Sequence, residues 1–147
     1  EMILGYFSLN ALMIIPAFTL NIRELKGLNH AMMWATIIAG IIFLIFPAPI
    51  GFARTTVAGQ WAGFYQNLYS VDNVANTFPS LHVTFSYLFS RVIIHAHKKL
   101  FYHFWIWFLI ISLSVLLTHQ HHLIDIFGGI ALAEICFRYF FLRAINE

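Results

Sequence analysis

The stretch that decides the fold is LFYHFWIWFLIISLSVLL, residues 100–117. It contains no Asp, Glu, Lys or Arg. Its length approaches the roughly 20 residues that an α-helix needs to cross the hydrocarbon core of a bilayer. The stretch therefore predicts a membrane-spanning helix.

The composition of the whole chain agrees with a membrane environment. Of 147 residues, 61% are hydrophobic and only 10% are charged, whereas about a quarter of the residues of a soluble domain are charged. A formal net charge of +2 without a cluster of Lys or Arg argues against a nucleic-acid partner. The single Cys136 excludes an internal disulfide. We expect membrane lipids to surround most of the chain.

Four further apolar segments accompany residues 100–117, and together they predict about five transmembrane helices in one all-α integral membrane domain, residues 1–147. Pro47 and Pro49 end the second segment. Within the long connection that follows, Trp61, Phe64 and Leu68 recur at helical spacing and predict a short interfacial helix. Because the chain begins at Glu1 and not at Met, we expect one N-terminal helix to be missing. The four segments are residues 2–20, 31–46, 80–94 and 123–142.

Basic residues predict the orientation in the membrane. If five helices alternate, the segments 21–30 and 95–99 lie on the same side as the C-terminus. Near that side lie Arg23, Lys26, Arg91, Lys98, Lys99, Arg138 and Arg143. The other side keeps only Arg54. Since cytoplasmic loops carry the excess of Lys and Arg, we expect a cytoplasmic C-terminus and extracytoplasmic connections at 47–79 and 118–122.

Two histidines and one carboxylate gather at the predicted outer ends of the helices. His82 opens the third helix and Asp125 opens the fifth, so both lie at about the same depth. His121 is four residues before Asp125 and shares its helix face, so Asp125 can accept a hydrogen bond from one ring nitrogen. The other ring nitrogen is then left as a nucleophile or base. His122 is three residues before Asp125 and competes for the same carboxylate; the spacing does not choose between them.

The same end offers groups that suit an anion. Ser80 after Pro79 is a typical helix N-cap, and the backbone N–H groups behind it can bind an anion. Arg54 adds a permanently charged fork that fits phosphate oxygens. An anion site beside two histidines favours phosphoryl transfer. Further residues that we expect to line the site are His119, Gln120 and His122.

These residues resemble the signatures of the type-2 phosphatidic acid phosphatase superfamily, whose fold is shared with vanadium haloperoxidases. Its PSGH signature is similar to Pro79-Ser80-Leu81-His82, with Leu81 in place of Gly. Its SRxxxxxHxxxD signature is similar to the run from Ser114 to Asp125, with Val115 in place of Arg. Both lie in the expected order, each at an outer connection.

The first signature of that family, KxxxxxxRP, is degenerate here. Arg54 matches its Arg, but Pro47 stands in place of Lys and Thr55 in place of Pro. The resemblance extends from about Phe46 to Gly129. Members of the family usually have six helices, one more than this chain shows.

The resemblance implies a metal-independent membrane lipid phosphatase that needs no cofactor. It implies that His121 attacks phosphorus while Asp125 stabilises the resulting imidazolium. His82 would protonate the leaving oxygen and then activate water to hydrolyse the phosphohistidine. The substrate would be a lipid phosphate monoester or pyrophosphate. The implied phosphate-binding groups are Arg54, Ser80 and the backbone N–H of Leu81.

Other functions remain open from the sequence. Loss of the Lys and of one Arg is also found in branches similar to head-group phosphotransferases, so an alcohol could replace water as the acceptor. A non-catalytic membrane scaffold is a further alternative. The histidines 82, 119, 121 and 122 could supply imidazoles to a metal, but no Cys or acidic pair completes a familiar ligand set. A bis-histidine haem is disfavoured because these histidines lie at helix starts.

Overall fold

A computed structural model of the chain describes residues 2–49, 51, 58–71 and 76–146. Within these residues all regular elements are helices. In chain order they are α1 (Met2–Ile14), α2 (Pro16–Thr19), α3 (Ile22–Ile45), α4 (Ala62–Val71), α5 (Leu81–Ala96), η1 (Lys98–Leu100), α6 (Phe101–Leu117), α7 (Leu123–Cys136), η2 (Phe137–Phe141) and α8 (Leu142–Asn146). Here η1 is a 3₁₀-helix and η2 is a π-helical turn between α7 and α8.

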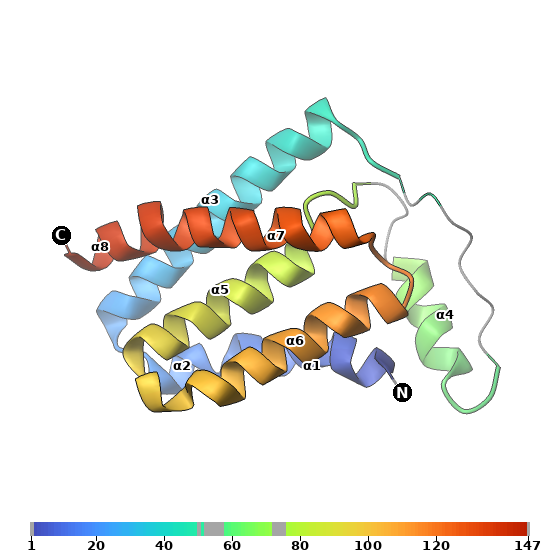
Figure 1. Cartoon of the computed structure of the whole chain (residues 1–147), viewed down its shortest axis with the longest axis horizontal. Coiled ribbons are helices and arrows are strands. Elements are labelled where there is room, and N and C mark those ends of the chain that lie inside the picture. Colours follow the sequence, from blue (N-terminus) through green and yellow to red (C-terminus); the bar gives the residue numbers. More distant parts are fainter. Residues whose placement is uncertain (1, 50, 52–57, 72–75, 147) are drawn as a thin grey trace.

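Helix α5 forms the centre of the bundle and contacts α1, α3, α6 and α7. Figure 1 shows α5 running between α6 and α7, with the short α4 set apart at one end. The buried positions of α5 include Thr84, Ser86 and Ser90 as well as larger apolar side chains. Small residues at helix contacts let the backbones approach closely, as is common in membrane bundles.

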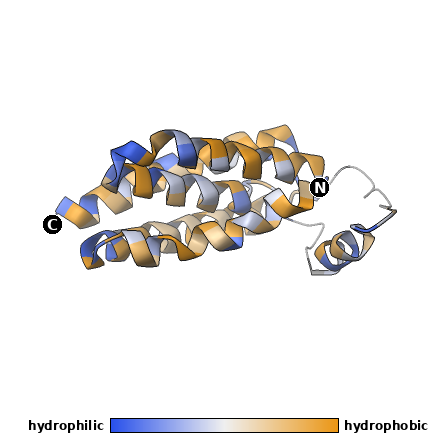
Figure 2. Cartoon of the chain, turned by 90° about the horizontal axis from the view of Figure 1, so that it is seen from below, coloured by the Kyte–Doolittle hydropathy of each residue, from blue (hydrophilic) through white to orange (hydrophobic). Residues whose placement is uncertain are grey.

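Three of the described helical segments are long and apolar enough to cross a membrane: Met2–Thr19, Ile22–Ile45 and Lys98–Leu117. Their outward faces carry exposed apolar side chains such as Leu4, Leu44 and Ile106, which suit a lipid environment. The predicted fold class, an all-α membrane bundle, is confirmed. Figure 2 shows the hydrophilic parts of the bundle gathered towards the end where the C-terminus lies.

The two remaining expected spans, α5 and α7, are the more polar inner helices. They carry Arg91 and Glu134, and these charges are paired inside the protein. Glu134 accepts a hydrogen bond from the Tyr87 hydroxyl at 3.0 Å. It also lies 2.6 Å from Arg138 Nε and 3.5 Å from Arg91 Nε. Pairing of this kind makes charges tolerable in an apolar bundle.

Two helix boundaries differ from the expectation. Helix α3 starts at Ile22, although the apolar pattern placed its start near Ala31. Asn21 and Glu24 form a capping box, with the backbone N–H of each bonded to the side chain of the other at 2.9 Å; this Asn-x-x-Glu signal was present in the sequence. The first segment is divided into α1 and α2 at Pro16, which has no N–H to continue the helix.

The N-terminal turns of α5 and α7 pack against each other at Gly129. A Cβ at this position would lie 2.7 Å from the backbone oxygen of Ser80 and 3.1 Å from Val83 Cβ. The Thr84 hydroxyl lies 2.8 Å from the Ser80 carbonyl oxygen and 3.2 Å from that of Gly129. The Ser80 N–H donates to the Asp125 carbonyl oxygen at 3.1 Å. This junction sets the positions of the two helix starts that carry the predicted site.

We expect Gly129→Ala to lower the stability of the protein by about 1–3 kcal/mol, because the added methyl group must displace backbone and not a flexible side chain. Gly40→Ala is the matched control, since a Cβ at this position in α3 meets no atom within 4 Å. Thermal unfolding in detergent would measure both. Equal midpoints for the two variants would contradict the close approach of α5 and α7.

Candidate active site

The predicted catalytic side chains converge at one end of the bundle, the end to which α4 is attached (Figure 1). His82 lies in the first turn of α5, and Asp125 lies in the first turn of α7. The rings of His82 and His121 lie near each other, with centroids 6.4 Å apart and planes inclined by 59°. A small anion could therefore lie between two imidazoles that come from different elements.

Asp125 orients His121. Its Oδ2 lies 3.3 Å from Nδ1 of His121 and accepts the backbone N–H of His122 at 2.8 Å. The carboxylate is buried, with 2% of its side chain exposed, and the His121 side chain is 10% exposed. With its proton on Nδ1, His121 donates to Asp125 and keeps a lone pair on Nε2. Of the two candidate partners, His121 makes the ring contact with the Asp125 carboxylate, and His122 donates its backbone N–H to it and caps the helix start together with Asp125.

Ser80 caps the start of α5. Its Oγ accepts the backbone N–H of Val83 at 3.4 Å, and the residue is fully buried. Leu81, the next predicted phosphate-binding residue, is the first residue of the helix. The N–H groups of a first helical turn have no carbonyl partner within the helix and carry partial positive charge. The Ser80 side chain thus holds the helix start in place from inside the bundle.

The remaining predicted lining residues all lie in the connection between α6 and α7, but their environments differ. His119 is exposed and adopts a left-handed backbone conformation with φ of 55°. Gln120 is buried, with 1% exposed, and its side-chain amide donates to the Thr118 carbonyl oxygen at 3.4 Å. It therefore supports the turn from within. Nε2 of His122 accepts the backbone N–H of Gly51 at 3.4 Å.

Arg54, the predicted phosphate-binding cation, lies outside the described residues. The contact between Gly51 and His122 brings the chain shortly before Arg54 to the edge of the site. A second hydrogen bond holds the same connection, because Thr77 donates its N–H to the Ala48 carbonyl oxygen at 2.9 Å. Both ends of the long connection are thus held near the starts of α5 and α7.

Tyr6 in α1 is a site residue that the sequence did not indicate. Its ring lies against His82 with a centroid separation of 4.5 Å and an interplanar angle of 37°, and the residue is buried. Because α1 lies outside the recognised motifs, no spacing rule pointed to Tyr6. Its only signal was a ring with a polar tip near the outer end of an apolar segment, which is common in membrane proteins.

A metal centre was one of the alternatives. Among the described residues, no group of three or more His, Cys, Asp or Glu side chains is arranged to hold a metal ion. The arrangement that is present, a carboxylate behind one imidazole and a second imidazole facing it, suits nucleophilic and acid–base chemistry.

Comparison with known proteins identifies the family. The family model of the PAP2 superfamily matches residues 4–139, which include the described residues of the predicted site. Neither curated proteins nor solved structures yielded a match. The match covers most of the chain and supports a phosphatase-type function in general terms. As the motifs around His82 and His121 predicted, the chain belongs to the PAP2 superfamily.

Proposed function

We propose that the protein is a membrane lipid phosphatase that forms a phosphohistidine on His121. One observation carries the proposal: the Asp125-oriented ring of His121 faces His82 across the starts of α7 and α5, with ring centroids 6.4 Å apart. In a PAP2 chain, such a pair can attack a phosphate from one side and protonate the leaving group from the other.

In the first step, the Nε2 lone pair of His121 forms a bond to phosphorus while the bond between phosphorus and the ester oxygen breaks. Positive charge develops on the imidazole, and the Asp125 carboxylate stabilises it through Nδ1. Protonated His82 gives its proton to the departing oxygen, so that the lipid alcohol leaves neutral. Such general acid catalysis is typically worth about 10²- to 10⁴-fold in rate.

In the second step, neutral His82 removes a proton from water. The hydroxide attacks phosphorus, the bond between phosphorus and Nε2 breaks, and inorganic phosphate leaves. His121 recovers its lone pair, and His82 is protonated for the next turnover. Neither step requires a metal ion.

Backbone groups and Arg54 would hold the nonbridging oxygens. The N–H of Leu81 lies at the start of α5, where the helix dipole favours an anion. Since the Ser80 side chain is buried, we assign to it the role of fixing this turn. Arg54 would supply the positive charge that these backbone groups lack. Its replacement should therefore weaken phosphate binding more than it lowers the rate of the chemical steps.

A lipid substrate and an extracytoplasmic site are part of the proposal. The site lies at one end of an apolar bundle, whereas Lys98, Lys99 and Arg143 belong to elements at the other end. By the positive-inside rule, we expect the basic end to face the cytoplasm. A substrate anchored in the outer leaflet would present its phosphate at the level of His82 and His121.

Transfer of the phosphorylated head group to an alcohol is the second candidate. It is favoured by Pro47 and Val115, which stand where the family signatures have Lys and Arg. The Val115 side chain is fully buried, so that position adds no charge to the site. With fewer cations to bind free phosphate, an acceptor alcohol would serve the second step as well as water.

We expect the full chain in detergent to release phosphate from a panel of lipid phosphates, including phosphatidic acid and a polyprenyl pyrophosphate, in the presence of EDTA. His121→Ala should abolish the release, because no nucleophile remains. His103→Ala is the control, since this histidine lies near the start of α6, away from the site. Denatured wild-type enzyme should carry an acid-labile phosphate on histidine.

Loss of activity in EDTA would show that a metal acts and would contradict this mechanism. Release only in the presence of an added alcohol would establish the transferase. If neither reaction occurred with any lipid, the scaffold alternative would be favoured.

Asp125→Asn should lower kcat by about 10²-fold or more, because the amide cannot stabilise an imidazolium as a carboxylate does. The amide oxygen can still accept the His122 N–H, so the start of α7 should be preserved. Parallel measurement of kcat and of the unfolding temperature separates the two effects. A variant with normal turnover would remove Asp125 from the mechanism.

The proposed orientation can be tested by labelling in intact cells. In a Cys136→Ser background, Gln66→Cys in α4 should react with an impermeant maleimide from outside. Lys98→Cys, in η1 at the opposite end, should react only after permeabilisation. Both native side chains are exposed. The reverse pattern would place the site in the cytoplasm.

A further inference from the structure

A single amide in α1 differs from the other polar groups of that helix. Asn10 is exposed, and its side chain makes no hydrogen bond to any part of the chain that the structure describes. Ser8, by contrast, donates to the Gly5 carbonyl oxygen at 2.6 Å and accepts from Trp107 Nε1 at 3.0 Å. By helix rise, Asn10 lies about 12 Å along α1 from Met2. An unpaired amide at such a depth in an apolar span is a candidate ligand-binding group.

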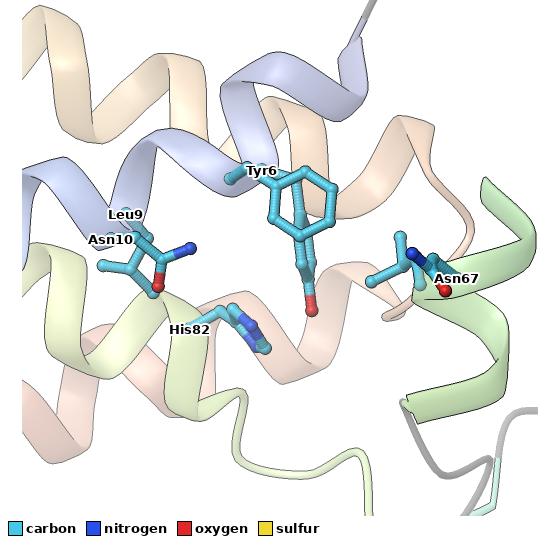
Figure 3. A pocket seen from close by; sticks show the side chains of 7 residues that line it. Tyr6, Leu9, Asn10, Asn67 and His82 are labelled. Atoms are coloured by element: carbon cyan, nitrogen blue, oxygen red, sulfur yellow. The ribbon is translucent and has the colours of Figure 1, made fainter. Parts of the chain in front are cut away.

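Asn10 lines a cavity of about 430 Å³ between α1, α4 and the start of α5. Its polar lining includes Asn67 and His82, and Leu9 and Leu68 form part of its apolar wall. Figure 3 shows Asn10 and Asn67 on opposite sides of the cavity, with Tyr6 and His82 between them. The volume falls within the range of about 300–1,000 Å³ that is usual for small-molecule pockets.

The cavity adjoins only one of the two facing histidines. His82 lines it and His121 does not. In the proposed reaction, on which this inference rests, His82 gives its proton to the leaving oxygen. The atoms next to that oxygen would then lie on the side of His82, which is where this cavity opens. Phe7 and Asn10 are exposed at its edge, so hydrocarbon chains can continue from the cavity into the bilayer.

We propose that this cavity holds the alcohol part of the lipid substrate and that Asn10 determines which alcohols are preferred. The amide would hydrogen-bond to a hydroxyl, ester or amide group within a few atoms of the phosphoester. Glycerol-based and sphingoid phosphates share this chemistry. A polyprenyl phosphate carries only hydrocarbon there and would leave the Asn10 amide without a partner, which is costly away from water.

The first test compares kcat/KM for phosphatidic acid, ceramide 1-phosphate and farnesyl phosphate in the full chain. The wild type should prefer one of the first two. Asn10→Leu should reduce that preference over farnesyl phosphate by about three- to tenfold, the usual value of one hydrogen bond. Asn29→Leu is the matched control: Asn29 is an exposed asparagine near the start of α3, at the other end of the bundle. An unchanged ratio in Asn10→Leu, or a wild type that prefers farnesyl phosphate, would overturn the assignment.

The second test measures ligand binding to the cavity in the absence of turnover, so that its outcome does not depend on the proposed reaction. In the His121→Ala background, binding of radiolabelled phosphatidic acid and farnesyl phosphate is measured with and without Asn10→Leu. A selective loss of phosphatidic acid affinity would support the cavity assignment even if the wild type released no phosphate. If Asn10→Leu left the affinity for phosphatidic acid unchanged relative to that for farnesyl phosphate, the assignment would be rejected, whatever the activity measurements show.

Discussion

The rest of the site depends on the close approach of α5 and α7 at Gly129. Only a residue without a side chain lets the Ser80 carbonyl approach α7 so closely, and the Thr84 hydroxyl lies within hydrogen-bond distance of carbonyl oxygens on both sides of this contact. The Ser80 N–H adds a direct bond to the Asp125 carbonyl oxygen. Because both helices that carry the candidate catalytic residues begin at this junction, a small separation of the helices would move His82 away from His121. Reaction rates are sensitive to such displacements, since much of catalysis is the positioning of groups.

Several polar groups in the bundle are paired with one another, although the buried hydroxyls of Ser90 and Ser112 have no hydrogen-bond partner among the described residues. Glu134 is surrounded by Tyr87, Arg91 and Arg138, and Trp107 donates to Ser8. In an apolar medium an unpaired polar group is costly, so such pairing stabilises the fold. The Asn10 amide makes no hydrogen bond to the described residues, and it lines the same cavity as His82. Such an exposed amide is available to a ligand, which supports the proposed selection of the lipid alcohol.

Much of the fold could be predicted because a bilayer restricts which structures are possible. Apolar runs of sufficient length must be helical in lipid, and the starts of α5 and α7 were placed within one residue of those observed. Helix α3 starts earlier than the apolar run predicted, because its first turns are polar and its start is set by the Asn21–Glu24 capping box. The burial of Ser80 and Gln120 could not be predicted, since burial depends on which helices become neighbours.

By itself, the sequence determined the all-α membrane class, the PAP2 motifs and the four-residue spacing of His121 and Asp125, because these depend on local composition and on helix periodicity. Only the tertiary structure decided that the His121 ring contacts the carboxylate, and that Tyr6 packs on His82. It also decided that Asn10 shares a cavity with that histidine. These relations join residues far apart in the chain, and they arise from how helices pack around Gly129 and α5. Packing of this kind is set by the shapes of many side chains together, and no single stretch of sequence contains it.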